Sequence, residues 1–154
     1  MKRCEIAVVN RSGRKPEMDL GKVQAVVDAA LAEDGMERCA LTVLLVDDHE
    51  SARLHREHFD DSDPTDVMTF PDGSKDPESG LTLLGDLAVG VEVARRVAGE
   101  RDRSEADEIC LYVLHGVLHL LGYDDEEEAD ALEMWRVQRR LLATVGIELE
   151  SDPS

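Results

Sequence analysis

The segment of this sequence that most restricts the fold is a largely apolar run at residues 109–121. Its nonpolar side chains would point in nearly every direction around a helix axis, and they are Ile109, Cys110, Leu111, Val113, Leu114, Val117, Leu118, Leu120 and Leu121. A helix that is apolar all round is usually buried. We therefore predict a buried helix over 104–121 with Ser104 as its N-cap.

The other segments mix strand and helix patterns without a strict strand–helix–strand rhythm. Runs of apolar and β-branched residues predict strands over 4–10, 39–47, 67–70 and 81–91. Helical spacing and capping residues predict helices over 19–35, 48–59, 92–100 and 126–146. Polar, turn-rich loops are expected over 60–66 and 71–80. This pattern is typical of an α+β fold in which a small mixed sheet packs against helices.

The length of 154 residues is enough for one domain with a core, and we expect it to span 1–150 with a frayed tail at 151–154. No apolar run reaches the roughly 18 residues of a transmembrane helix, and the first residues lack a signal-peptide pattern. The three cysteines form no CxxC pair and each lies in an apolar run, as is typical of a reducing compartment. We expect a cytoplasmic protein with no membrane partner.

The charge balance is strongly acidic, with 35 acidic and 17 basic residues and a net charge of −18. Such a charge disfavours non-specific affinity for polyanions and for anionic membranes. Taken alone it counts against a nucleic-acid-binding protein. Solubility is a simpler explanation of the acidic surface than a specific function of that surface.

Two histidines lie one turn apart in the buried helix. The i, i+4 spacing of His115 and His119 places both imidazoles on one helix face, close enough to share a metal ion. Gly116 removes a side chain beside this pair and lets another group approach. Asp124 and Asp125 follow directly and could fold back to supply a third ligand. Two histidines and one carboxylate form a known catalytic zinc set, with water in the fourth position.

An alternative interpretation needs no metal. Core histidines are often satisfied by backbone carbonyls, and the two aspartates could cap the last predicted helix, because Asp124 with Glu127, or Asp125 with Glu128, fits a capping box. Spacing alone leaves both interpretations open. The zinc-protease motif requires Glu directly after the first histidine, where this chain has Gly116, so a protease mechanism with a general base on the helix is absent.

Three segments, in this order, resemble the YbeY family of metal-dependent endoribonucleases, which act in rRNA maturation. HGVLHLLGYDD (115–125) fits ten of the eleven positions of the family signature His-Gly-x-Leu-His-Leu-x-Gly-Tyr-Asp-His. DPTDVMTFP (63–71) resembles the family's Pro-Thr-Asp-Val-Leu-Ser-Phe-Pro, and LLGDLAVGVEVARR (83–96) resembles its Gly-Asp-Ile strand followed by a helix. The resemblance spans about residues 40–145.

The resemblance implies that His115 and His119 are metal ligands and that Asp125 stands where the family has its third histidine. A carboxylate ligates zinc well, so this role can survive the change. It also makes a bound water less acidic than three neutral histidines would. The implied cofactor is one zinc ion per chain, although two histidines and a carboxylate also suit iron(II) or another divalent metal. Asp124 is the competing ligand.

Further catalytic residues are only weakly indicated. Many family members have a basic residue about five positions before the Pro-Thr-Asp segment, where this chain has Phe59 and Asp60. Arg56 lies nearby, although a solvated helix face explains it more simply. Asp86 is a candidate partner for a histidine N–H. Beyond a water that the metal activates, the catalytic group is not assigned.

The resemblance implies a single-strand-specific endoribonuclease in rRNA maturation, including processing of the 16S rRNA 3′ end and ribosome quality control. Its implied partners are single-stranded RNA and components of the small ribosomal subunit, and not DNA. Two other classes of function stay open, a non-haem iron oxygenase and a ribosome-assembly binding module with a structural metal. A closed site with four protein ligands would support the last, because catalytic sites keep an open position.

Overall fold

The computed structural model describes residues 2–59 and 66–150. The elements, in chain order, are β1 (Cys4–Asn10), α1 (Leu20–Glu33), β2 (Cys39–Val46), α2 (Asp48–Phe59), β3 (Val67–Pro71), β4 (Thr82–Gly90), α3 (Val91–Glu100), α4 (Glu105–Leu120) and α5 (Glu128–Ala143). All predicted strands and helices are present, with ends within three residues of the predicted ones. Residues 60–65 of one predicted loop and the predicted tail at 151–154 lie outside the described residues.

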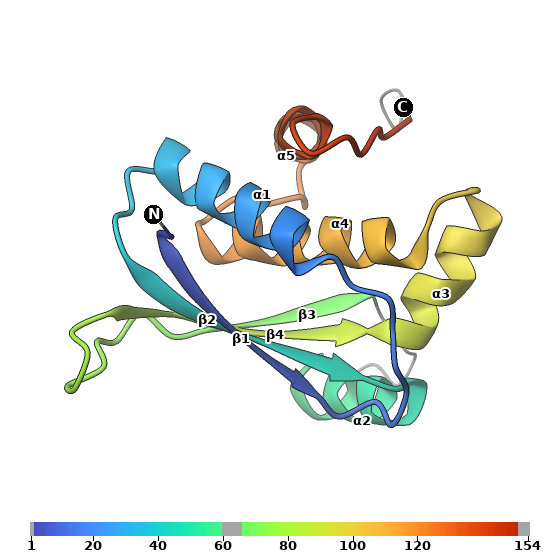
Figure 1. The fold of residues 1–154 in the computed structure, drawn as a ribbon, viewed down its shortest axis with the longest axis horizontal. Coiled ribbons are helices and arrows are strands. Elements are labelled where there is room, and N and C mark those ends of the chain that lie inside the picture. The colour runs from blue at the N-terminus through green and yellow to red at the C-terminus, as the bar shows by residue number, and fades with distance from the viewer. Residues whose placement is uncertain (1, 60–65, 151–154) are drawn as a thin grey trace.

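The four strands form one mixed sheet in the order β1-β2-β4-β3. The strands β1, β2 and β4 are parallel, and β3 pairs with β4 in the antiparallel direction. Helices α1 and α4 cover one face of this sheet, α5 lies beyond them, and α2 lies against the opposite face (Figure 1). The predicted α+β fold with a small mixed sheet is confirmed.

The apolar run identified in the sequence becomes α4, the central helix of the core. Its Ile109, Leu114 and Leu118 are at most 1% exposed, and burial of each such side chain stabilises the fold by roughly 1.5–3 kcal/mol. Ser104 caps the helix, because its hydroxyl accepts a hydrogen bond from the Asp107 N–H at 3.1 Å. A Cβ on Gly116 would lie 2.7 Å from the Leu87 Cδ2 atom, so this glycine allows α4 to pack closely on β4.

A bulge in β4 decides which side chains of this strand face α4. The β2–β4 register shifts between Ala40 and Leu41, and Gly85 adopts φ of +150° with room for no Cβ, since that atom would lie 2.5 Å from the Phe70 carbonyl oxygen. Beyond the bulge, Leu87 packs in the core that contains α4. Side chains alternate along a strand, so Asp86 points to the other face.

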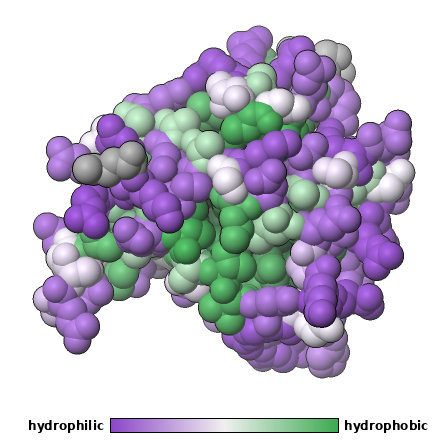
Figure 2. Space-filling view, viewed as in Figure 1, coloured by the Kyte–Doolittle hydropathy of each residue, from purple (hydrophilic) through white to green (hydrophobic). Residues whose placement is uncertain are grey.

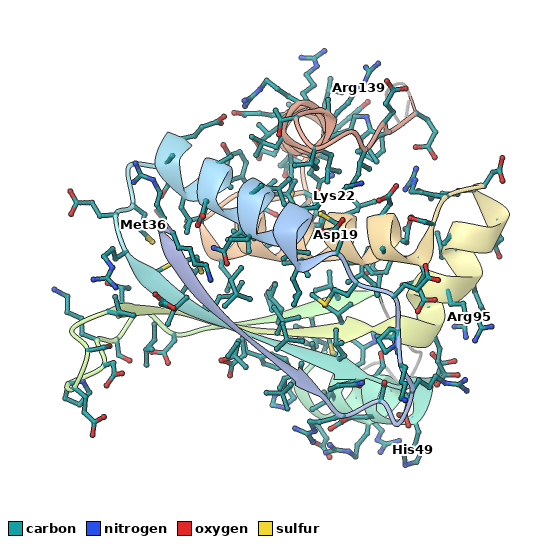
Figure 3. The ribbon with its side chains drawn as sticks, viewed as in Figure 1. Asp19, Lys22, Met36, His49, Arg95 and Arg139 are labelled. Atoms are coloured by element: carbon teal, nitrogen blue, oxygen red, sulfur yellow. The ribbon has the colours of Figure 1, made fainter. Side chains whose placement is uncertain are left out.

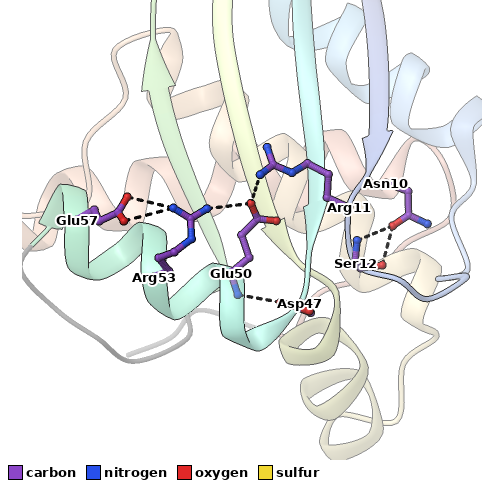
Figure 4. Close-up of polar contacts among 7 residues, drawn as sticks. All are labelled: Asn10, Arg11, Ser12, Asp47, Glu50, Arg53 and Glu57. Atoms are coloured by element: carbon purple, nitrogen blue, oxygen red, sulfur yellow. Dashed lines mark hydrogen bonds and ion pairs between the residues drawn. The ribbon is translucent and has the colours of Figure 1, made fainter.

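Helix α2 is a polar helix held at its start and along its surface by charged side chains (Figure 4). The Asp47 carboxylate accepts a hydrogen bond from the Glu50 N–H at 2.8 Å and so caps the helix. Arg53 pairs with Glu50 and with Glu57, each at 3.2 Å, and Arg11 at the end of β1 also pairs with Glu50. Such surface pairs contribute about 0–1 kcal/mol each, so they position α2 more than they stabilise it.

Helix α1 starts at a cap that the sequence predicted. The Asp19 carboxylate accepts a hydrogen bond from the Lys22 N–H at 3.1 Å, and the Lys22 Nζ atom lies 3.6 Å from Asp107 at the start of α4 (Figure 3).

On the molecular surface, hydrophobic residues gather in a band across the middle of the face shown in Figure 2. Val8 and Val9 of β1 and Leu20 of α1 are exposed. Within the described residues, no helix combines the length and apolar character needed to cross a membrane.

Candidate metal centre

Three predicted ligands converge at the C-terminal end of α4. The Nε2 atoms of His115 and His119 are 3.0 Å apart. The Oδ2 atom of Asp125 lies 3.7 Å from the first and 3.5 Å from the second. Zinc–ligand bonds of 2.0–2.1 Å in tetrahedral geometry place ligand atoms about 3.3 Å apart. The three observed distances bracket this value, so the donor set fits one metal ion of this size.

The turn after α4 brings Asp125 back toward the helix. Gly122 adopts φ of +104°, and its N–H donates to the His119 carbonyl at 3.0 Å. The Tyr123 N–H donates to the Leu118 carbonyl at 3.0 Å, which closes the reversal. Glycine is favoured at this left-handed position, so Gly122 directly follows the end of the helix predicted over 104–121.

Both imidazoles are oriented through their Nδ1 atoms. The Nδ1–H of His115 donates to the Gln138 side-chain oxygen at 2.5 Å, and the Nδ1–H of His119 donates to the Tyr123 carbonyl at 3.1 Å. A neutral imidazole with a protonated Nδ1 has a lone pair on Nε2. Two lone pairs and a carboxylate oxygen therefore face the same point, which is unfavourable without a cation between them.

The environment of His115 also favours the neutral form that binds a metal ion. Burial lowers the pKa of His115 below its ordinary value, although the hydrogen bond to Gln138 acts in the opposite direction. The neutral form is the one that ligates metals, because protonation removes the lone pair. His115 is thus held in its ligating form to lower pH than an exposed histidine would be.

Gln138 is a site residue that the sequence reasoning missed. It lies in α5 and is only 4% exposed. One signal in the sequence could have identified Gln138. It is a polar residue on the buried face of an amphipathic helix, where the other buried residues are Met134, Leu141 and Leu142. Buried polar side chains need hydrogen-bond partners, and the partner of Gln138 is His115.

The capping role suggested for Asp124 and Asp125 is wrong. The N-cap of α5 is Glu127, which makes no side-chain capping hydrogen bond. Asp124 instead accepts hydrogen bonds from the N–H groups of Asp125 and Glu126, at 2.7 and 3.1 Å. Asp124 therefore shapes the turn, and Asp125 is the carboxylate that faces the histidines.

The two weaker catalytic candidates do not join this site. Asp86 is exposed on the sheet face opposite α4, and both histidine Nδ1 atoms bond to other groups. Arg56 is exposed on α2, where its neighbours His55 and Phe59 line a cleft with the two histidines but Arg56 does not. His55 is half-buried there, whereas His49 is exposed (Figure 3).

Clefts open on two sides of the histidines. The smaller, about 180 Å³, is formed by α2 and β3 and reaches both His115 and His119. The larger, about 440 Å³, is formed by α3, α4 and α5 and reaches His115 and Gln138. His115 lines both clefts, so an extended molecule can approach the candidate metal centre from either side.

Comparison with known proteins places the chain in a family. A sequence model described as Endoribonuclease YbeY matches residues 9–146, which include all three candidate ligands. The chain belongs to the YbeY family. Endoribonuclease YbeY of Salinispora tropica is 41% identical over 150 residues, covering 90% of this chain and 94% of that protein. Endoribonuclease YbeY of Halorhodospira halophila is 37% identical, covering 96% of each chain.

A solved structure has a similar fold. The solution structure of a protein from Thermotoga maritima matches with a TM-score of 0.57 and 25% sequence identity, covering 97% of this chain and 99% of that chain. The α+β architecture of the YbeY-family chain described above is therefore shared by a solved structure. The resemblance that the three sequence segments indicated is confirmed.

Proposed function

We propose that this chain is a metal-dependent endoribonuclease that hydrolyses single-stranded RNA in rRNA maturation, with His115, His119 and Asp125 as metal ligands. The observation that carries this proposal is the convergence of two Nε2 lone pairs and one carboxylate oxygen in a member of the YbeY family. Family membership supports a hydrolase acting on RNA, and the geometry supports a metal at this point.

The donor set suits hydrolysis. His115, His119 and Asp125 would hold a divalent metal and leave a coordination position open, and the metal would supply an acidified water and polarisation of a phosphodiester oxygen. The chain's own contribution is orientation, because Gln138 and the Tyr123 carbonyl fix the two imidazole rings. Zinc is the proposed metal, and iron or another divalent ion is compatible with the same ligands.

The two other classes of function receive less support. An iron oxygenase would use a similar donor set, but the relatives are named endoribonucleases. A structural metal usually has four protein ligands, whereas the candidate group within the described residues has three. An open position supports catalysis at this site.

The proposed setting is the cytoplasm, with one domain over residues 1–150. The proposed roles are 16S rRNA 3′-end processing and ribosome quality control, with small-subunit components as partners. The net charge of −18 supports a need for such partners, because general attraction to RNA is weak for so acidic a chain. DNA and membranes are not proposed as partners.

The experiment is a cleavage assay on a single-stranded RNA and its duplex. We expect metal-dependent cleavage of the single strand that chelator abolishes and that salt weakens, because phosphate contacts are screened. His119→Ala should abolish cleavage, while His49→Ala, which removes an exposed histidine elsewhere, should keep it. Equal cleavage by the His119→Ala protein would refute the site. Absence of cleavage with every divalent metal, with ribosomes present, would favour the assembly module.

A further inference from the structure

The larger cleft beside His115 has the form of a small-molecule site. Its volume of about 440 Å³ falls in the usual range for such sites, roughly 300–1,000 Å³. Leu111 and Tyr112 of α4 are its most deeply buried apolar walls, at 7% and 5% exposure. The half-buried Trp135 of α5 faces the same space, and the exposed Asp66 and Arg101 lie among its lining residues.

We propose that this cleft binds one base of the RNA strand, stacked on Trp135, next to the phosphodiester that is cleaved. The inference rests on the proposed function and adds a specificity site to it. An extruded base is available in single-stranded RNA and not in a stacked duplex, so this cleft would help to select single strands.

The position of the cleft ties it to the candidate metal centre. His115 and Gln138 line the cleft and are hydrogen-bonded to each other, and His115 Nε2 points toward the other two ligands. Gln138 and Trp135 are three residues apart on α5, hence on one face of that helix. A base bound in the cleft would therefore lie beside His115 and beside Gln138, the side chain that orients it.

The charge of the lining favours a base over a phosphate. Asp66 and Arg101 bring opposite charges to the cleft, and the third charged lining residue, Glu108, is paired with Arg103 at 2.7 Å. Tyr112 donates its hydroxyl to Glu108, and burial raises the pKa of Tyr112 so that this hydroxyl stays protonated. The lining therefore has no excess of positive charge to bind a phosphate, whereas a neutral base meets aromatic and apolar surface.

Trp135 has a feature that packing alone does not explain. Its Nε1–H is buried and has no hydrogen-bond partner within the described part of the chain. Such a group is unfavourable, and a phenylalanine would fill space there without it. An indole, however, offers a large face for stacking on a base, an interaction that tolerates every base type.

Fluorescence tests the cleft without relying on cleavage. Trp135 is the single tryptophan of the chain, so its emission reports on this site alone. We expect a single-stranded oligoribonucleotide to quench the emission of the chelator-treated protein, and ribose 5-phosphate at the same concentration to leave it unchanged. Unchanged emission, while the anisotropy of a labelled oligoribonucleotide shows that it binds, would overturn the proposal.

Cleavage kinetics separate the cleft from the endoribonuclease activity. In the wild-type protein, an RNA with one abasic nucleotide beside the mapped cleavage position should show a kcat/KM at least about fivefold lower than intact RNA. Trp135→Leu should lower kcat/KM for intact RNA to a similar extent and remove the sensitivity to the abasic nucleotide. Trp135→Phe, which keeps a ring, should retain most of the activity.

Val137→Ala serves as the matched control, because this half-buried α5 residue packs on the core and does not line the cleft. It should keep both the activity and the abasic effect. Equal cleavage of intact and abasic RNA by the wild-type protein would overturn the base site and leave the endoribonuclease intact. No cleavage of any RNA would refute the proposed function, and the fluorescence titration would then decide the cleft alone.

Discussion

The position of the Asp125 carboxylate can be explained in two ways, by metal ligation or by simple ion pairing with the histidines. Its side chain is 45% exposed, and its Oδ2 atom lies 3.5 Å from the His119 Nε2 atom. An exposed ion pair contributes only about 0–1 kcal/mol to stability. Because α5 does not use Asp125 as a cap, the place of this carboxylate opposite two Nε2 atoms is best explained by metal binding.

Substitutions of Asp125 give a first prediction. Asp125→His should keep the metal, since imidazole forms bonds of similar length, and should shift the activity profile to lower pH because the site becomes more positive. Asp125→Asn should bind the metal much more weakly, because the amide is a neutral and poorer ligand. Metal affinity of the two variants, measured beside wild type, checks this. Full metal content in the Asp125→Asn protein would remove Asp125 from the ligand set.

The buried His115 gives a prediction about pH. Its pKa is lowered in the folded protein, chiefly by burial, from about 6.5 in an unfolded chain. Below about pH 6.5 the unfolded state binds more protons, so the stability that neutral His115 provides is present above that pH and lost as pH falls. The metal-free wild type should lose more thermal stability than His115→Gln between about pH 7.5 and about pH 5.5. Parallel losses in the two proteins would contradict this.

Helix α5 acts on the candidate metal centre through one residue. Gln138 faces α4, whereas the next residue, Arg139, points outward (Figure 3). We expect Gln138→Met to weaken metal binding by roughly 10- to 100-fold, because the ring of His115 loses its acceptor. Gln138→Glu keeps an acceptor and should keep the metal. Calorimetric titration with zinc compares the two, and equal affinity in both variants would show that α5 does not orient the ligand.

The elements themselves were predictable because their signals are local. Apolar periodicity and side-chain caps at Asp19 and Ser104 lie within each helix, and the i, i+4 histidine spacing fixes two ligands on one face. Gln138 was missed because it meets His115 only through the docking of α5, 23 residues further along the chain. The carbonyl of Tyr123, which orients His119, has no side-chain signature in any sequence.

Two sequence interpretations failed: the placement of Asp86 beside a histidine, and the capping of the last helix by Asp124 or Asp125. Asp86 was placed near a histidine, but the bulge at Gly85 and the pairing of β4 decide which sheet face each side chain takes. The capping boxes failed because an acidic run at 124–128 offers several overlapping matches, and pattern alone cannot choose among them. Asp66, which belongs to the second family-like segment, lines the larger cleft.

For the whole molecule, the acidic charge and the position of the candidate centre have to be considered together. A chain with a net charge of −18 repels RNA at long range, yet clefts reach the histidines from two sides. Under the proposed function, affinity for RNA would come from contacts near the candidate metal centre and from a partner that brings the RNA. The fold forms these two clefts by placing α2 and β3 on one side of His115 and α3 and α5 on the other.

The most direct test of the central claim is a titration of the metal-free protein with zinc while bound metal and RNA cleavage are recorded together. We predict one ion bound per chain, with cleavage rising in proportion and reaching its plateau at one equivalent. His115→Ala and His119→Ala should neither bind the ion tightly nor cleave, because a methyl group cannot replace a ligand. Cleavage by the metal-free protein, or unchanged metal binding in both variants, would contradict the account.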